Sequence, residues 1–316
     1  MPMSSSQPRG QVLVIGSATV DLTTFSARLP GPGETLLGDA FSLVMGGKGA
    51  NQAVAAARAG AETRFVGCVG DDLFASLVRE GLAAAGVDLA HLREVPGQTG
   101  IAHIRVDGAG ENDIVMVPLA NDALGADQID AALDEAAPTG GVLLTQLEIP
   151  AAATLHAIRG ARDRGFSVVL DPAPARELDE QIWSLIDVVT PNETEAALLT
   201  GIAVADRDDA VRAGHWFLER GVGAALITRA GAGSVLVTHD EVHDIAAHSV
   251  TVVDTTAAGD AFTGYLAAEL AGGQGLTRAV ERAGAAGAIA VTRRGASPSI
   301  PGRDEVQQLL ADGVRA

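Results

Sequence analysis

VLLTQLEIPAAATLHAIRGARDRGFSVVL, residues 142–170, predicts a strand, a helix and a second strand in direct succession. Val142–Gln146 and Phe166–Leu170 are short apolar runs with β-branched residues, as in buried strands. Between them, Pro150 precedes the Ala-rich stretch Ala151–Arg164, and proline is tolerated where a helix begins. A strand–helix–strand unit connects two parallel strands, so this stretch favours an α/β fold.

The same alternation continues along the rest of the chain. Further strands are expected at Gln11–Gly16, Thr63–Val69, Ile186–Thr190 and Ala224–Thr228. Helices are expected at Asn51–Ala59, after Asp71 or Asp72, after Asp206 with Gly221 as its stop, and at Ala257–Ala271, Leu276–Thr292 and Arg303–Ala311. We therefore expect a doubly wound, mostly parallel sheet flanked by helices on both faces. Residues 1–10 are expected to be a flexible tail, and 11–316 a single domain.

Segments 20–46 and 99–118 interrupt this alternation. The first contains LPGPGET and the strand-like LLGDAFSLVM, and the second reads as TGIAHIRV, a DGAGEN turn and DIVMVP. Both segments can form a small β-flap outside the main sheet. Both can equally be ordinary surface hairpins, and the pattern leaves the two interpretations open.

Composition excludes several classes of function. The chain has 316 residues and a net charge of −18, which argues against a general binder of phosphate backbones. Aromatic residues are only 3%, no apolar run approaches a membrane span, and MPMSSSQPRG lacks the apolar core of a secretory signal. Cys68 is the only cysteine, which excludes an intrachain disulfide and a cysteine-based zinc site. We expect a cytoplasmic protein with neither nucleic-acid nor membrane partners.

The two common nucleotide fingerprints are missing. Lys48 is followed by Gly49 and not by Ser or Thr, and no G-x-G-x-x-G follows the first strand. A nucleotide would therefore have to bind by another route.

GGKGANQ, residues 46–52, is a glycine-rich turn before a predicted helix. Glycines let a ligand approach the backbone closely, and the helix start offers free N–H groups. Lys48 and Asn51 can hydrogen-bond hydroxyl groups. The alternative is a turn that only leads into the helix.

DTTAAGDAF, residues 254–262, places small residues and then an acid at a helix start. The amides of Ala257, Ala258 and Gly259 can surround developing negative charge, and Asp260 can accept a proton. An acid in the first turn is also favourable for the helix by itself. The run of small residues favours the functional interpretation, because a cap does not require it.

Four further residues and one further segment can be interpreted in two ways. Asn192 and Glu195 in NETE have the spacing of a capping box, and Glu195 can also help to hold hydrated Mg²⁺. Asp21 and Glu148 follow the ends of predicted strands, where α/β sheets collect ligands, and can accept sugar hydroxyls or be solvated loop acids. TRAGAGS, residues 228–234, can lie along a nucleotide or form a hairpin.

Together these motifs resemble the ribokinase-like carbohydrate kinase family over nearly the whole chain. The matching segments are GSATVD (16–21), GGKGANQAVAAARAGA (46–61), TGIA (99–102), GEN (110–112), QLE (146–148), DPAPARELD (171–179), TPNETEA (190–196), DTTAAGDAF (254–262) and AIAVTRRGASPSIP (288–301). The resemblance implies transfer of phosphate from ATP to D-ribose, giving D-ribose 5-phosphate and ADP. It also implies Mg²⁺ with the nucleotide, K⁺ as an activating cation, and a homodimer formed through a β-sheet lid.

The resemblance assigns roles to individual positions. It implies Asp260 as the general base and Ala257, Ala258 and Gly259 as an anion hole. It implies sugar contacts at Thr19, Asp21, Gly47, Lys48, Gly49, Asn51, Glu148 and Asp260, and nucleotide contacts at Asn192, Thr228, Gly231, Gly233, Gly259 and Gly284. Glu195 matches a position that holds Mg²⁺ through water, and the K⁺ positions are Asp254, Thr256, Ala290, Arg293, Gly295 and Ser299.

Several positions depart from the family pattern. Thr19 replaces a common Asn, and Ala230 and Leu119 stand where glycine is usual. Residues 257–260 read Ala-Ala-Gly-Asp in place of the more widespread Gly-Ala-Gly-Asp. Two other functions remain open beside the phosphorylation of D-ribose. One is a related kinase for deoxyribose, another sugar or a nucleoside, and the other is a non-catalytic sugar or nucleotide sensor on the same fold.

Overall fold

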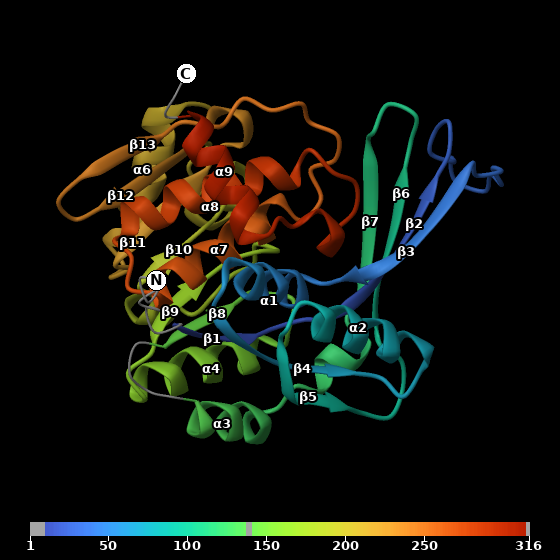
Figure 1. Ribbon diagram of the computed structural model, residues 1–316, viewed down its shortest axis with the longest axis horizontal. Coiled ribbons are helices and arrows are strands. Elements are labelled where there is room, and N and C mark those ends of the chain that lie inside the picture. Colours follow the sequence, from blue (N-terminus) through green and yellow to red (C-terminus); the bar gives the residue numbers. More distant parts are fainter. Residues whose placement is uncertain (1–9, 137–140, 314–316) are drawn as a thin grey trace, which may run out of the picture.

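The structure is a computed structural model that describes residues 10–136 and 141–313, so the predicted tail lies almost wholly outside the described residues. A nine-stranded sheet, sheet A, has the order β13-β12-β11-β10-β9-β8-β1-β4-β5 (Figure 1). Its strands are β1 (Gln11–Ile15), β4 (Glu62–Val69), β5 (Asp88–Glu94), β8 (Val142–Thr145), β9 (Ser167–Leu170), β10 (Val188–Val189), β11 (Ala224–Thr228), β12 (Ser234–Thr238) and β13 (Val242–Ile245). All pairs are parallel except β11–β12 and β12–β13 at one edge. The predicted mostly parallel sheet is confirmed.

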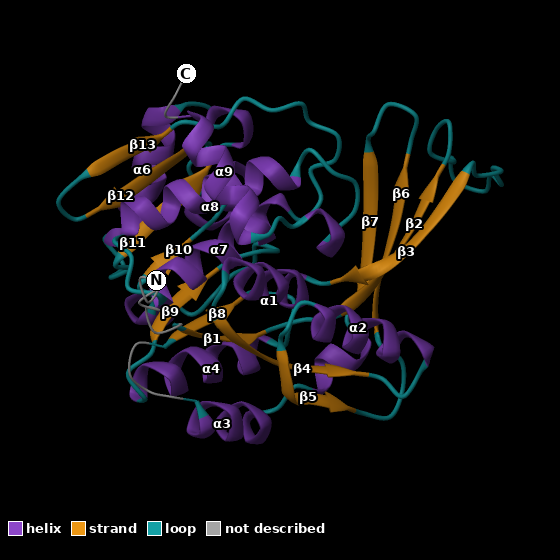
Figure 2. Ribbon diagram, viewed as in Figure 1, coloured by secondary structure: helices purple, strands orange, loops and turns teal. Residues whose placement is uncertain are grey.

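Helices cover both faces of sheet A, and Figure 2 shows the strands between the two helical layers. One layer contains α1 (Lys48–Ala59), α2 (Leu73–Ala84), α7 (Ala258–Ala271), α8 (Leu276–Ala290) and α9 (Arg303–Gly313). The other contains α3 (Ala126–Glu135), α4 (Ala151–Asp163), α5 (Glu193–Thr200), α6 (Arg207–Leu218) and the 3-10 helix η2 (Glu180–Leu185). Along β1, Val12 and Val14 join the first core while Leu13 and Ile15 join the second. This alternation follows from the two-residue period of a strand.

Segments 20–46 and 99–118 form one sheet and not two separate hairpins. Sheet B has the order β3-β2-β6-β7, with β2 (Thr19–Phe25), β3 (Ala40–Gly46), β6 (Gly100–Val106) and β7 (Asn112–Val117). Parallel pairing of β2 with β6, from Thr19–Gly100 to Phe25–Val106, joins the two segments. Figure 1 shows this sheet standing to one side of the helical layers.

Element boundaries differ from the prediction where a local contact decides them. Helix α1 begins at Lys48 and not at Asn51, because Gly47 takes a left-handed φ of 88° and serves as its N-cap. Strand β10 is shorter than predicted, because the N–H of Ile186 closes η2 on the carbonyl of Trp183. Asp72, one of the two predicted caps, accepts from the N–H groups of Phe74 and Ala75.

Some elements carried no clear signal. Strand β5 reads DLAHLRE, with mostly polar residues on an edge strand, and α3 and its 3-10 neighbour η1 (Leu119–Ala123) were not expected. Within the described ranges, no helix is long and apolar enough to cross a membrane.

Candidate active site

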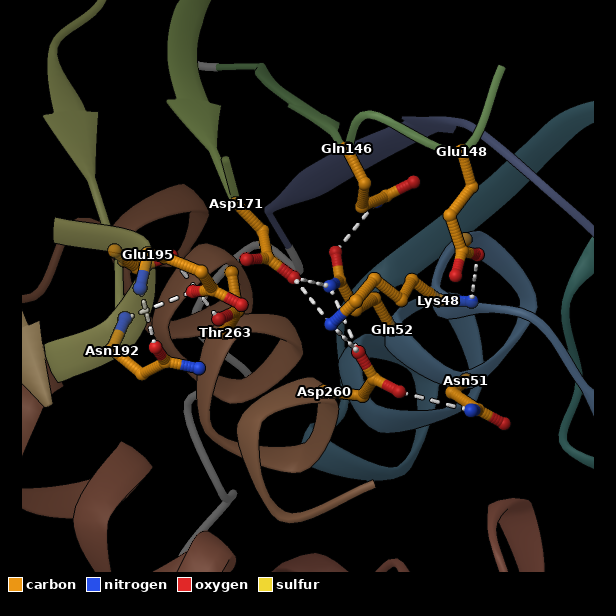
Figure 3. Close-up of polar contacts among 12 residues, drawn as sticks. Lys48, Asn51, Gln52, Gln146, Glu148, Asp171, Asn192, Glu195, Asp260 and Thr263 are labelled. Carbon is orange, nitrogen blue, oxygen red and sulfur yellow. Dashed lines mark hydrogen bonds and ion pairs between the residues drawn. The ribbon is translucent and has the colours of Figure 1, made fainter. Parts of the chain in front are cut away.

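The candidate site lies where several strand ends of sheet A meet the first turns of α1 and α7. Gln146 and Glu148 follow β8, Asp171 follows β9, and Ser17 follows β1. Carboxyl ends of parallel strands share one edge of a sheet, which explains why these polar residues converge. Figure 3 shows the side chains of Gln146, Glu148 and Asp171 gathered around Lys48, Gln52 and Asp260.

Asp260 lies in the first turn of α7 and is only 5% exposed. The helix starts after Ala257, whose left-handed φ of 58° redirects the chain. Asn51 Nδ2 donates to Asp260 Oδ2 at 2.9 Å, and Gln52 Nε2 donates to Oδ1 at 3.1 Å. A buried carboxylate is therefore held by two side-chain amides at a helix N-terminus.

Lys48 is the cation of this cluster. Its Nζ lies 3.5 Å from Asp171 Oδ2 and 3.8 Å from Asp260 Oδ1. Burial disfavours the charged amine, but the negative charges of Asp171, Asp260 and Glu148 outweigh it and raise the pKa of Lys48. The ammonium therefore stays charged between the two aspartates.

Asp171 is a site residue that our candidate set did not contain, although DPAPARELD was among the matching segments. Burial raises its pKa to about 7, against the opposing attraction of Lys48 and a hydrogen bond from Gln52. It directly follows a predicted strand, so the rule that selected Asp21 and Glu148 also selects it. Gln52 was likewise missed, although it lies inside GGKGANQ.

Asp21 lies within β2 of sheet B and is buried, so it is not the loop acid after a strand that was one of its two interpretations, whereas Glu148 follows β8 as expected. Glu148 accepts from Ser17 Oγ at 2.5 Å and from the Lys48 N–H at 2.9 Å, and burial raises its pKa. Burial also raises the pKa of Asp21, to about 7, and Thr19 Oγ1 donates to it at 3.2 Å. A Cβ at Gly46 would lie 2.0 Å from Asp21 Oδ1, so this position requires glycine.

Gly259, one residue of the predicted anion hole, borders open space. A Cβ at Gly259 would meet no atom within 4 Å. The N–H of Ala258 makes only a long, 3.3 Å contact with the carbonyl of Thr255. The first turn of a helix has N–H groups without intrahelical acceptors, so this end of α7 can receive an anion.

Asn192 and Glu195 form the predicted capping box at the start of α5. Asn192 Oδ1 accepts from the Glu195 N–H at 2.8 Å, and Glu195 Oε2 accepts from the Asn192 N–H at 2.9 Å. The charge of Glu195 also contributes to the raised pKa values of Lys48 and Asp171. The capping interpretation is confirmed, and the carboxylate also acts electrostatically on the cluster.

The other candidate nucleotide residues lie on neighbouring elements. Thr228 ends β11 and pairs with Asn192, and the turn 230–232 (η3) leads to Gly233. A Cβ at Gly233 would lie 2.1 Å from the carbonyl oxygen of Ile245. A Cβ at Gly231, or at Gly284 on α8, would meet no atom within 4 Å, which leaves room for a ligand.

Asp254 joins the two segments that were predicted to hold K⁺. It accepts from the N–H and Oγ1 of Thr256 at 2.9 and 2.7 Å, and from the Gly295 N–H at 2.8 Å. Burial opposes ionisation, but these hydrogen bonds outweigh it and lower the pKa of Asp254. The guanidinium of Arg293 pairs with Glu305, and Ser299 Oγ donates to the carbonyl of Ala296. Because these two side chains already have partners, Arg293 and Ser299 can offer a cation their backbone carbonyl groups.

The chain is similar to known carbohydrate kinases over nearly its whole length. The family model for pfkB family carbohydrate kinases matches residues 9–303. The chain is 38% identical over 303 residues to the ribokinase of Haemophilus influenzae, covering 96% of this chain and 99% of that protein. It is 35% identical over 302 residues to the deoxyribokinase of Salmonella typhi, covering 95% and 98%.

Two solved structures are also similar. The ribokinase of Thermotoga maritima has a TM-score of 0.86 at 36% identity, covering 96% of this chain and 99% of that one. The ribokinase of Arabidopsis thaliana, in complex with ribose and ATP, has a TM-score of 0.87 at 31% identity, covering 95% and 98%.

Proposed function

Because this chain belongs to the pfkB family of carbohydrate kinases, we propose that it transfers the γ-phosphoryl group of ATP to O5 of D-ribose. The products are D-ribose 5-phosphate and ADP. Ribokinases at 36–38% identity and a similar structure that contains ribose and ATP support this reaction.

The observation that carries the proposal is the buried Asp260 carboxylate at the N-terminus of α7. As general base, Asp260 takes the proton from O5 of ribose while O5 forms a bond to the γ-phosphorus. The bond from that phosphorus to the β–γ bridging oxygen breaks, and ADP leaves with the electron pair. The hydrogen bonds from Asn51 and Gln52 fix the carboxylate for this step.

We assign the sugar to the space bounded by Asp260, Asp21 and Glu148, with Thr19, Gly47, Lys48, Gly49 and Asn51 as the remaining contacts. A carboxylate can accept hydrogen bonds from two hydroxyl groups, which suits a polyol ligand. The glycine at position 46 supports this, because the absence of a side chain there leaves room for the Asp21 carboxylate. Sheet B carries Thr19 and Asp21, and we propose that it closes over the sugar as a lid and excludes water.

The transferred phosphoryl group would lie at the start of α7. The amides of Ala257, Ala258 and Gly259 and the dipole of the helix would stabilise its developing negative charge. Lys48 supplies the local positive charge in an otherwise acidic chain.

ATP would lie along the edge formed by Asn192, Thr228, Gly231, Gly233 and Gly284, where Gly231 and Gly284 leave open space. Mg²⁺ bound to ATP neutralises phosphate charge, and Glu195 would hold one of its waters. Glu195 fits this role because its capping contact uses only Oε2.

K⁺ would lie between 254–256 and 290–299 as the activating cation. The residues fit such an ion because Asp254 provides negative charge and the other positions can offer carbonyl oxygens. Asp254 already connects the two segments, so a cation there would stabilise the loop that leads into α7.

We further propose a homodimer through sheet B. Phe41 and Leu43 on β3 and Val115 and Val117 on β7 point to one face, opposite Asp21, and Phe41 and Val115 are 60% and 65% exposed. A second copy would cover this apolar face.

Steady-state ADP release over D-ribose, 2-deoxy-D-ribose, hexoses and nucleosides tests the function. We expect the highest kcat/KM with D-ribose. The deoxyribokinase relative makes 2-deoxy-D-ribose the second candidate, and a higher kcat/KM for it would replace the substrate assignment. If the protein binds ATP and ribose but releases no ADP in response to sugar, the alternative of a non-catalytic sugar or nucleotide sensor is favoured.

A further inference from the structure

Gln52 places one side-chain amide between two buried carboxylates. Its Nε2 donates to Asp171 Oδ2 at 2.6 Å and to Asp260 Oδ1 at 3.1 Å, as Figure 3 shows. The residue is fully buried on α1, so water does not compete for these contacts. A primary amide nitrogen has two N–H groups, and here each of them has an acceptor.

Gln146 determines which way this amide faces. Gln146 Nε2 donates to Gln52 Oε1 at 2.6 Å, and Gln146 is also fully buried. Because this hydrogen bond engages the amide oxygen of Gln52, the amide nitrogen faces Asp171 and Asp260. A Cβ at Gly16 would lie 2.1 Å from Gln146 Oε1, so the glycine at the end of β1 keeps room for this support.

Lys48 also contacts both carboxylates, but it differs from Gln52 in accessibility. Its side chain is 28% exposed, and its contacts with Asp171 and Asp260 are longer, at 3.5 and 3.8 Å. The ammonium can therefore reach toward a bound substrate, whereas the Gln52 amide stays inside the protein. Asp21 and Glu148 add further negative charge near Asp260.

We infer that Gln52 is a positioning residue: held by Gln146, its amide fixes the Asp260 carboxylate relative to Asp171 in the orientation that accepts the sugar proton. This inference rests on the proposed function, because Gln52 acts through the general base. Gln52 needs no contact with the sugar, since both of its donors are already used inside the protein.

The Gln52→Met variant removes the amide and keeps the length of the side chain. We expect kcat with D-ribose to fall about 10- to 100-fold, with KM for ribose changed by less than roughly threefold, because a hydrogen bond to a charged group is lost. Turnover is expressed per site that binds an ATP analogue, so that unfolded protein does not count. An unchanged kcat per site would contradict the positioning role and leave Gln52 with a structural role alone.

Gln128→Met is the matched control. Gln128 is another buried glutamine, but its amide donates to the carbonyls of Gly67 and His91, outside the site. It should lower Tm and leave kcat per site unchanged. Gln146→Met, which keeps the Gln52 amide but removes its support, should lower kcat about 3- to 10-fold and remains informative if Gln52→Met does not fold.

A double-mutant cycle with Asp260→Asn separates this inference from the proposed function. In single turnovers with excess enzyme, Gln52→Met should lower the rate of the Asp260→Asn protein by less than roughly twofold, because residues that act as one unit are non-additive. A further drop of about 10-fold or more in that background would overturn the positioning role. If Asp260→Asn alone keeps normal turnover, the general base assignment fails, whatever Gln52 does.

Discussion

The side-chain amide of Asn51 donates a 2.9 Å hydrogen bond to Oδ2 of Asp260, although 209 positions separate the two residues in sequence. The bond joins the first turn of α1 to the first turn of α7, and the two helices pack along each other. Two helix N-termini therefore converge on one buried carboxylate. Their partial positive charges favour the anionic groups that phosphoryl transfer brings together.

Glu195 caps α5, and one substitution separates this capping role from the proposed role in holding a water of Mg²⁺. Glu195→Gln keeps an oxygen that can accept the Asn192 N–H, so we expect Tm to change by only a few degrees. The Mg²⁺ concentration for half-maximal activity should rise about 3- to 10-fold, because a carboxylate holds metal-bound water more strongly than an amide does. A titration of ADP release against free Mg²⁺ measures this.

Asp209→Asn provides the control, because Asp209 forms the capping box of α6 with Asp206. It should affect Tm in the same way and leave the Mg²⁺ titration unchanged. If Glu195→Gln behaves like this control, capping is the whole role of Glu195.

The loop around Asp254 predicts sensitivity to the monovalent cation. Replacing K⁺ by Na⁺ or Li⁺ should lower kcat several-fold, because the smaller ions fit a set of fixed carbonyl oxygens poorly. Asp254→Asn should raise the K⁺ concentration for half-maximal activation, while Asp244→Asn, which removes only a surface partner of Arg207, should not. Equal activity in all three cations would contradict the proposed site.

Three departures from the family pattern coincide with an unusual backbone. Among the described residues, the non-glycine residues with positive φ are Leu119, Ala230 and Ala257, at 50°, 43° and 58°. Each stands where the resembling family usually has glycine, and a side chain in this conformation costs about 1–2 kcal/mol. These positions therefore retain a glycine-like backbone without the glycine.

Ala230→Gly tests this strain. Relief of about 1–2 kcal/mol exceeds the entropic cost of glycine, about 0.4–1 kcal/mol, so Tm should rise slightly. Ala232→Gly, in the same turn but outside the positive-φ set, should lower Tm instead. Thermal unfolding of both variants in the absence of nucleotide gives the comparison, and a lower Tm for Ala230→Gly would refute the strain.

Asp21 predicts a dependence of stability on pH. Its pKa is about 7 in the folded protein against an ordinary 3.8, because burial disfavours the charged form. As pH rises, the unfolded chain loses the Asp21 proton at a lower pH than the folded protein does. The free energy of unfolding is therefore highest, with respect to Asp21, below about pH 3.8, and it falls progressively up to about pH 7. Asp21→Asn should therefore raise Tm by a few degrees at pH 8 and much less at pH 5, while ribose KM rises.

The exposed Asp39→Asn should show neither effect. An Asp21→Asn protein that is destabilised equally at both pH values would mean that the carboxylate is stabilised in the folded state.

Sequence periodicity predicted the larger sheet well, because the buried strands of a parallel sheet are nearly continuous apolar runs. Strand β11 was predicted at its observed bounds, whereas β5 was missed because its residues are mostly polar and lie on the edge. Neither segment 20–46 nor segment 99–118 shows by its own sequence that the two pair into one sheet. It depends on pairing of β2 with β6, about 80 residues apart.

The sequence motifs predicted most of the residues that face the site. They did not predict the buried residues that hold those side chains in place. Asp260, Lys48 and Asn51 were identified and lie together. Asp171 and Gln52 were not, although Asp171 follows a predicted strand and Gln52 lies inside GGKGANQ. The buried hydrogen bond that joins them has no local sequence signature. The roles of Asn192 and Glu195 also needed the structure, which confirms the cap.

The proton acceptor is the central element of this account, and kcat of the Asp260→Asn variant with saturating D-ribose and MgATP tests it most directly. We predict a fall of about 10²- to 10⁴-fold, with ribose KM within roughly threefold of the parent value. The exposed Asp304→Asn on α9 should behave as the parent protein does. Turnover of a correctly folded Asp260→Asn protein within a few-fold of the parent would contradict the assignment of Asp260 as the general base.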